Sequence, residues 1–318
     1  MPLLEVSNLK TYFFTDRGVV KAVDGISFKL DKGETLGLAG ESGCGKSTTA
    51  YSLIKLVPPP GKIVSGKILL DGEGNIVDLP EPEVRRRVRW KRISMVFQGA
   101  MNALNPVYTI GQQICEVLTY HAQMTKEEAV ERAKELLTMV GLEPDIVNRY
   151  PHELSGGMKQ RSFIAMALAL NPDIIICDEP TTALDVVVQA QILNLLKELQ
   201  NKYGISIILI THDLGVTAEL SDKVAIMYAG KIAEQAPSEK IFLEPAHPYT
   251  KGLINSIPRL KSKVKITWIP GLPPNLINPP TGCRFHPRCP EAMDICKKEE
   301  PPIVKLSSDH EVMCWLYG

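Results

Sequence analysis

Two apolar patterns alternate along this chain, and together they predict its core. Uninterrupted apolar runs of strand length are typical of strands buried on both faces, as in a parallel sheet. Longer segments carry apolar residues at helical spacing. The predicted strands are Glu34–Ala39, Ile93–Phe97, Asp173–Glu179 and Ile205–Ile210, and the predicted helices are 47–56, 110–121, 125–140, 162–170 and 189–200. This alternation predicts an α/β fold with a doubly wound parallel core.

Other segments depart from this pattern. Leu3–Leu9, Val19–Leu30 and Lys67–Asp71 are rich in β-formers and broken by Gly or Asp, which predicts an antiparallel sheet beside the core. The helices predicted at 110–121 and 125–140 indicate a helical insert, and the second of them opens with a Thr125-x-x-Glu128 capping box. From about residue 236 the character changes, since 10 of the 24 prolines lie between positions 258 and 302. We expect a separate, largely irregular region there.

A glycine-rich segment joins the first buried strand to the helix that follows it. It matches G-x-x-x-x-G-K-[ST], the P-loop, in which backbone N–H groups and a helix N-terminus face phosphate oxygens. Lys46 would reach the β- and γ-phosphates, and Ser47 would bind Mg²⁺. The alternative is a glycine-rich turn that binds nothing. The nucleotide-binding candidates are Gly40, Glu41, Ser42, Gly43, Cys44, Gly45, Lys46, Ser47 and Thr48.

Two later features add candidate chemistry. Ser155-Gly156-Gly157 precedes a long helix, so its exposed N–H groups form a second anion-binding end. Asp178 and Glu179 end a buried strand, where a parallel sheet places its ligand-binding residues. The next buried strand leads into His212.

These segments, taken in order, resemble the ATP-binding subunit of ATP-binding cassette (ABC) transporters, a P-loop NTPase fold. The resemblance covers the chain to about residue 235. Residues 40–48 match the Walker A motif, Gln98 the Q-loop, 154–160 the signature motif, 174–179 the Walker B strand, 182–185 the D-loop and His212 the switch histidine. It implies domains at 1–235, with a helical subdomain at about 99–170, and a C-terminal extension at 236–318.

Further motifs narrow the resemblance to the dipeptide/oligopeptide importer subfamily. They are Phe97–Pro106, Tyr150–Gly157, His247–Thr250 and Gly282–Pro290. One departure is Gly99-Ala100, where the subfamily leads us to expect Glu-Pro. Because this loop faces the membrane subunits in the family, the departure leaves partner identity open.

The chemistry expected at this site is hydrolysis of the γ-phosphate of ATP, which depends on positioning and charge neutralisation. Asp178 would hold Mg²⁺ or its waters, and Glu179 would polarise the attacking water as general base. The alternative for Glu179 is a salt-bridged surface acid. The resemblance implies that His212 contacts the γ-phosphate and that Gln98 reaches Mg²⁺ and the water. Among Tyr12, Phe13 and Phe14, we assign Phe13 to stacking on adenine and leave the other two open.

The resemblance also implies partners. Two head-to-tail cassettes would sandwich two ATP molecules, with Ser155, Gly156 and Gly157 capping the γ-phosphate of the other subunit and Asp185 reaching across. We expect a sibling cassette rather than an identical copy, two integral membrane permeases and an extracytoplasmic binding protein. The 36 basic and 36 acidic side chains balance, which argues against nucleic-acid binding by overall charge. With no apolar run near 18 residues and no secretion signal at the start, we expect a cytoplasmic protein on the inner face of the membrane.

Seven cysteines are distributed unevenly. Cys44, Cys115 and Cys177 lie in apparent core elements, whereas Cys283, Cys289, Cys296 and Cys314 follow a C-x5-C-x6-C-x17-C spacing near the C-terminus. Structural zinc usually shows C-x2–4-C pairs, while four thiolates suit an iron–sulfur cluster. The subfamily has members credited with a 4Fe–4S cluster here, which we adopt, with Zn²⁺ or four free thiols as alternatives.

The leading hypothesis is therefore the ATPase subunit of a peptide importer. The same motor could serve oligosaccharide or nickel import, since the substrate is chosen by other subunits. A rival from another class is a soluble ABC ATPase that acts on nucleic acid or the ribosome. Such ATPases usually carry long inserts or two cassettes in one chain, and this chain shows a single cassette.

Overall fold

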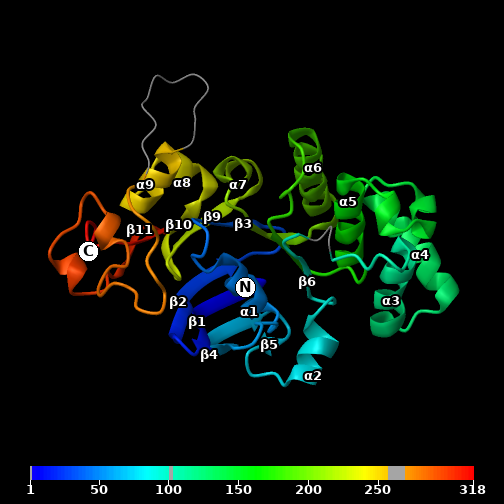
Figure 1. Cartoon of the computed structure of the whole chain (residues 1–318), viewed down its shortest axis with the longest axis horizontal. Helices are drawn as coiled ribbons and strands as arrows, with labels where there is room; N and C mark the ends of the chain where they lie inside the picture. Colours follow the sequence, from blue (N-terminus) through cyan, green and yellow to red (C-terminus); the bar gives the residue numbers. More distant parts are fainter. Residues whose placement is uncertain (1, 100–102, 257–268) are drawn as a thin grey trace. The chain divides into compact units, whose positions relative to one another are not determined.

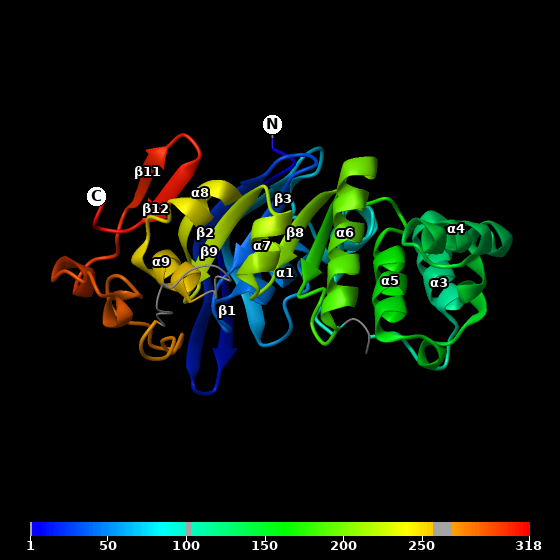
Figure 2. The same cartoon turned by 90° about the horizontal axis from the view of Figure 1, so that it is seen from above.

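The computed structural model describes residues 2–99, 103–256 and 269–318. By its internal contacts the chain forms two compact units, each with its own strands and helices (Figures 1 and 2). The first unit contains Met1–Asp31, Thr35–Asp78 and Ile210–Gly318, and the second contains Lys32–Glu34 and Leu79–Leu209.

The first unit begins with an antiparallel sheet, as predicted. Its strand order is β2-β1-β4-β5, and β1 pairs antiparallel with both β2 and β4. Leu4 and Val6 of β1 are buried with a less buried residue between them, and after a register shift Leu9 and Thr11 are buried in the same way, which is the alternation of a sheet with one covered face. The strands are β1 (Leu4–Thr15), β2 (Gly18–Leu30), β4 (Gly61–Leu70) and β5 (Gly74–Asn75).

A second group of strands in this unit holds the glycine-rich segment. Its order is β11-β12-β10-β9-β3; β3 and β9 run parallel, and every residue of β3 is buried. The strands are β3 (Thr35–Ala39), β9 (Lys223–Tyr228), β10 (Lys231–Pro237), β11 (Ile303–Ser307) and β12 (His310–Met313). The helices are α1 (Lys46–Leu53), α7 (Leu214–Leu220), α8 (Ser238–Leu243) and α9 (Pro248–Asn255).

The C-terminal region packs into the core of this first unit. Tyr249 from α9 and Phe285 join a buried cluster with Tyr228 of β9, and the three ring centroids lie 4.6–5.3 Å apart. The described part of the proline-rich stretch is irregular apart from 3₁₀ turns at His286–Arg288 and Ile295–Lys297. Regular elements flank it, since α8 and α9 precede it and β11 and β12 extend the sheet after it (Figure 1).

The second unit combines parallel strands with a helical group. Its strand order is β8-β7-β6, and β6 and β7 pair in parallel. The strands are β6 (Ile93–Val96), β7 (Ile174–Asp178) and β8 (Ser206–Ile210), the last ending at the unit boundary. The helices are α2 (Glu81–Glu83), a π-helical turn (Val84–Val88), α3 (Ile110–Ala122), α4 (Lys126–Met139), two 3₁₀ turns (Pro144–Asn148 and Pro151–Glu153), α5 (Gly156–Ala167) and α6 (Val186–Tyr203).

Local sequence signals explain where the helices of this unit begin. Thr125 and Glu128 form the predicted capping box at the start of α4, and Thr109 with Gln112 forms another at α3. Helices α3, α4 and α5 pack against one another, forming the predicted helical group (Figure 2). Within residues 2–99, 103–256 and 269–318, none of the helices has the length and apolar character needed to cross a bilayer.

Candidate functional site

The P-loop connects β3 to α1 in the first unit, and its glycines are required by the backbone. Gly40 and Gly45 have φ angles of 148° and 109°. A Cβ atom at Gly40 would lie 2.2 Å from the Met227 carbonyl oxygen, and one at Gly45 would lie 2.3 Å from the Ala22 carbonyl oxygen. Neither backbone position therefore tolerates another residue. Gly45 is also the N-cap of α1 and makes no side-chain cap, so the helix N-terminus keeps its N–H groups for an anion.

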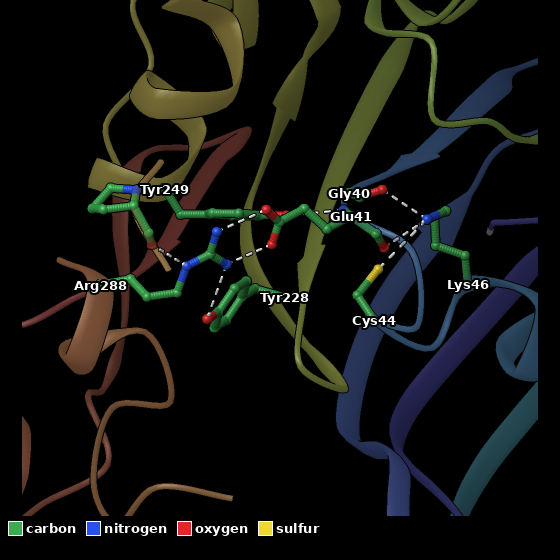
Figure 3. A network of polar contacts seen from close by, with 8 residues as sticks. Gly40, Glu41, Cys44, Lys46, Tyr228, Tyr249 and Arg288 are labelled. Carbon is green, nitrogen blue, oxygen red and sulfur yellow. Dashed lines mark hydrogen bonds and ion pairs between the residues drawn. The ribbon is translucent and has the colours of Figure 1, made fainter. Parts of the chain in front are cut away.

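Lys46 lies folded against this loop. Its side chain is buried, and Nζ donates hydrogen bonds to the carbonyl oxygens of Gly40 (2.7 Å) and Glu41 (3.0 Å) (Figure 3). Nζ also approaches the Cys44 sulfur at 3.7 Å. Cys44 is buried, and burial raises the pKa of its thiol. Cys44 is therefore a small core side chain beneath the loop, while the exposed Ser42 and Gly43 form its outer edge.

Glu41 of the P-loop is hydrogen-bonded to residues from a distant part of the first unit. Its carboxylate accepts two hydrogen bonds from Arg288, and its backbone N–H donates to the Tyr249 hydroxyl (Figure 3). The sequence motif did not indicate these partners, because they lie more than 200 positions away. The subfamily motifs that contain Tyr249 and Arg288 were visible in the sequence, but their contact with the P-loop was not.

The acids predicted at a strand end lie in the second unit. Asp178 ends β7 and is 1% exposed. Glu179 follows in a left-handed backbone conformation with φ 51°, which is uncommon for a residue other than glycine. Its Oε2 accepts hydrogen bonds from Gln98 Nε2 and from the Thr182 hydroxyl, both at 2.9 Å. The structure thus brings together Gln98, Asp178 and Glu179, and it adds Thr182, which sequence reasoning assigned only to the D-loop motif.

The predicted second anion-binding helix end is present in the same unit. Ser155 is the N-cap of α5, and its hydroxyl accepts from the Met158 N–H at 3.3 Å. A Cβ at Gly157 would meet Val188 of α6 at 2.7 Å, so this position requires glycine. Asp185 is the N-cap of α6 and accepts from the Val188 N–H at 2.9 Å. Both helix N-termini are therefore well formed.

Two other candidates belong to the first unit. His212 is exposed and directly precedes Asp213, the N-cap of α7. In the aromatic cluster on β1, Tyr12 donates a hydrogen bond to Asp24 at 2.6 Å, and Phe14 is 48% exposed. Phe13 is half-buried, and its ring lies beside Gly61 of β4, where an added Cβ would approach it to 2.7 Å. Ala100, in the loop that follows Gln98 in the second unit, lies outside the described residues.

The four C-terminal cysteines lie in one region but do not form a metal site in the structure. The Cys283 N–H donates to the Cys296 carbonyl at 2.8 Å. Burial, together with repulsion from the other thiolates, raises the pKa of Cys283 to about 11 and raises those of Cys289 and Cys314. Among the described residues, no group of three or more His, Cys, Asp or Glu side chains is arranged to hold a metal ion. None of the four forms a disulfide.

Comparison with known proteins bears on both halves of the chain. Residues 23–182 match the family model described as ABC transporter, and residues 233–296 match the model for the C-terminal region of oligopeptide/dipeptide transporters. Two relatives come from Bacillus subtilis (strain 168). The oligopeptide transport ATP-binding protein AppD is 50% identical over 99% of this chain and 97% of its own length. The dipeptide transport ATP-binding protein DppD is 50% identical over 99% of this chain and 94% of its own length.

Solved structures show the same fold. A bacterial ABC transporter cassette solved as a dimer matches with a TM-score of 0.65 and 30% identity, covering 74% of this chain and 98% of the cassette. The same cassette in a post-hydrolysis dimer bound to ADP and Pi matches equally, with a TM-score of 0.65. These matches confirm the predicted fold class of parallel core, antiparallel sheet and helical group.

Proposed function

This chain belongs to the ATP-binding subunits of the oligopeptide and dipeptide ABC transporters, and from this premise we propose that it hydrolyses ATP to power peptide import. The observation that carries the proposal is the P-loop, where an uncapped helix N-terminus, two sterically required glycines and a buried lysine form a phosphate site. The names of the relatives, which are oligopeptide and dipeptide transport proteins, support peptides as the cargo.

We assign the phosphate contacts to residues of the first unit. Lys46 would exchange its hydrogen bonds with Gly40 and Glu41 for the β- and γ-phosphates, because a phosphate oxygen is the stronger acceptor. Ser47 lies in the first turn of α1 and would offer its hydroxyl to Mg²⁺. Phe13 would stack on the adenine, and His212 would contact the γ-phosphate.

The remaining chemistry falls to the second unit. Asp178, a buried carboxylate at the end of β7, fits the hard oxygen ligand that Mg²⁺ prefers. When bound, Mg²⁺ neutralises charge on the phosphates. Glu179 would take a proton from the attacking water, and Gln98, already hydrogen-bonded to it, would help to orient that water.

We further propose that two cassettes close around ATP. The helix N-terminus at Ser155, Gly156 and Gly157 would face the γ-phosphate held by the other subunit, and Asp185 would lie at the same interface. A similar cassette was solved as a dimer, which supports this arrangement. We expect the second cassette to be a sibling chain. The division into a nucleotide-binding domain at 1–235, with its helical subdomain at about 99–170, and an extension at 236–318 is part of the same proposal.

For the cysteines we keep the iron–sulfur assignment as a proposal. The chemistry of the donors supports it, because Cys283, Cys289, Cys296 and Cys314 share one region and four thiolates are the usual ligands of a 4Fe–4S cluster. The cluster would have to draw these side chains together, since they are not arranged as a metal site in the structure. A bound cluster would convert thiols with raised pKa values to thiolates. We expect it to cross-link the irregular region. Metal analysis of anaerobically purified protein separates iron from Zn²⁺, and a colourless, iron-free preparation would exclude the cluster.

The partners follow from the role. A peptide importer requires two membrane permeases and an extracytoplasmic binding protein, so we place this chain on the cytoplasmic face of the membrane. The alternative cargo is an oligosaccharide or nickel. An ABC ATPase acting on nucleic acid or the ribosome is the rival class.

The test is ATP-dependent peptide uptake by proteoliposomes that contain this chain with its co-purified membrane subunits. Lys46→Ala should abolish uptake and weaken ATP binding by at least about tenfold in calorimetry, since a charge-assisted hydrogen bond to phosphate is lost. Lys55→Ala is the matched control, because this lysine follows α1 and donates to the Val77 carbonyl at 2.9 Å. Uptake that survives Lys46→Ala, or salt-sensitive nucleic-acid binding without membrane partners, would contradict the proposal.

A further inference from the structure

One P-loop residue is held by side chains from the C-terminal part of the chain. Arg288 Nη1 and Nη2 donate to Glu41 Oε2 and Oε1 at 2.6 and 2.9 Å, in the forked geometry that a guanidinium makes with a carboxylate (Figure 3). The Tyr249 hydroxyl accepts the Glu41 N–H at 2.9 Å. We call Arg288, Tyr228 and Tyr249 the Glu41 clamp.

The clamp is rigid because its members are themselves held. The Arg288 side chain is 5% exposed, its Nε donates to the Pro270 carbonyl at 2.8 Å, and its guanidinium lies 5.7 Å from the Tyr228 ring centre. The ion pair with Glu41 raises the pKa of Arg288. Tyr249 is fully buried between Tyr228 and Phe285. Neither Arg288 nor Tyr249 can turn away without losing buried contacts.

The clamp reaches the phosphate site through the backbone of Glu41. The Glu41 side chain and its N–H each have a partner, and its carbonyl oxygen accepts from Lys46 Nζ at 3.0 Å and from the Cys44 N–H at 3.4 Å. Fixing Glu41 therefore fixes the first turn of the P-loop and the resting place of its lysine. A loop held in one conformation does not lose that freedom when ATP binds.

Arg288 lies in the segment that carries two of the four cysteines. It directly precedes Cys289, while Arg284 directly follows Cys283. Arg284 forms its own buried ion pair, with Asp24, and also donates to the Ala229 carbonyl. The segment is thus attached to the rest of the first unit by two arginines, and of these Arg288 holds a P-loop carboxylate.

From this geometry we propose that Arg288 is a positioning residue for ATP binding, which keeps the P-loop preformed through Glu41 and makes ATP affinity depend on this one residue of the C-terminal segment Cys283–Cys289. The proposal rests on the function proposed above for the P-loop. The competing explanation is that the ion pair only attaches the segment to the core. In that case its loss would lower stability and leave ATP affinity unchanged.

The experiment compares full-length variants by calorimetry with Mg·ATP and by thermal unfolding without nucleotide. Arg288→Gln and Glu41→Gln should each weaken ATP affinity about tenfold, within the range of a typical coupling between sites. The double variant should be no weaker than either single variant, because both remove one ion pair. Arg288→Lys should recover part of the affinity by restoring the charge. In steady-state kinetics KM for ATP should rise while kcat stays within about twofold.

Arg284→Gln is the matched control, since it breaks another arginine–carboxylate pair from the same segment, one whose carboxylate is more buried than that of Glu41. It should lower the unfolding temperature yet leave ATP affinity within about twofold. ATP affinity that is unchanged in folded Arg288→Gln, or weakened equally by Arg284→Gln, would overturn the inference. If Arg288→Gln does not fold, Glu41→Gln and Tyr249→Phe decide in its place, with the same tenfold criterion.

Lys46→Ala separates this inference from the proposed function. If Lys46→Ala loses ATP affinity and Arg288→Gln does not, the P-loop binds ATP and only the clamp proposal fails. If Lys46→Ala keeps its affinity, the assignment of the P-loop itself fails, and the clamp proposal fails with it.

Discussion

Glu41 and Glu179 are both glutamates of the phosphate-handling motifs, yet the structure holds them in different ways. Glu41, in the first unit, has its carboxylate in a forked ion pair with a buried arginine. Glu179, in the second, accepts hydrogen bonds from the neutral side chains of Gln98 and Thr182. A buried ion pair is costly to break, at about 3–5 kcal/mol for loss of one partner, whereas a hydrogen bond from a neutral donor to a carboxylate contributes about 1.5–3 kcal/mol.

This difference separates a positioning carboxylate from a reacting one. Both carboxylate oxygens of Glu41 accept hydrogen bonds from Arg288, which fits a positioning role. Glu179 accepts hydrogen bonds from Gln98 and Thr182 and has a strained backbone, with φ 51°, and strained conformations cluster at functional sites. We therefore expect substitution of Glu41 to change ATP binding and substitution of Glu179 to change turnover.

The largest expected effect is that of Glu179→Gln. The amide keeps the size of the side chain but cannot accept a proton, so kcat should fall by about 100-fold or more. ATP affinity should stay within about threefold of the wild type, and ATP should trap an associated pair of cassettes. Phosphate release measures turnover, calorimetry measures affinity, and size-exclusion chromatography with ATP detects the pair. Near-normal turnover would refute the assignment of Glu179 as base.

Acid should lower the stability of the first unit, in which Glu41 is held. His247 is the buried N-cap of α9, and its Nδ1 accepts the Tyr249 N–H at 3.0 Å. Burial, with a smaller contribution from the charge of Lys251, lowers the pKa of His247 to about 4. The unfolded chain has the ordinary histidine pKa of about 6.5, so between pH 6.5 and 4 it binds a proton that the folded chain does not.

The free energy of unfolding should therefore fall as the pH drops from 6.5 towards 4, and the contribution of His247 to this fall is about 3 kcal/mol. His247→Asn keeps an N-cap acceptor and removes the titration. Urea unfolding at pH 7.0 and 4.5 should show a smaller acid loss in this variant. The comparison of variants is needed because other groups, including the buried His310–Glu234 pair, lie in the same unit. Equal acid losses would contradict the assignment.

Much of the fold was predictable because it is encoded locally. The apolar runs at Ile174–Asp178 and Ser206–Ile210 form buried strands, and the Thr125–Glu128 capping box starts α4, because burial and capping depend on neighbouring residues. The P-loop was predictable for the same reason, since its glycines, lysine and helix are contiguous.

The clamp around Glu41 was not predictable from the sequence. Arg288 and Glu41 are 247 positions apart, and no local pattern pairs two charges across that distance. The prolines between 258 and 302 indicated an irregular region, but they did not predict that this region packs against the core through Phe285. The left-handed backbone of Glu179 was also hidden, because glutamate has no preference for that conformation. The hydrogen bond from Thr182 to Glu179 could have been predicted, because the two residues are only three positions apart in the sequence.

The smallest expected effect concerns Glu179 and is that of Thr182→Val. Thr182→Val replaces the hydroxyl that donates to Glu179 Oε2 with a methyl group of similar size. Because a hydrogen bond to a charged carboxylate contributes about 1.5–3 kcal/mol, kcat should fall by roughly tenfold or more while ATP affinity is unchanged. Thr182→Ser keeps the hydroxyl and should restore most of the turnover, which phosphate release measures. If the serine variant is as slow as the valine variant, Thr182 acts through packing of its methyl group, and Glu179 does not depend on this hydrogen bond for its orientation.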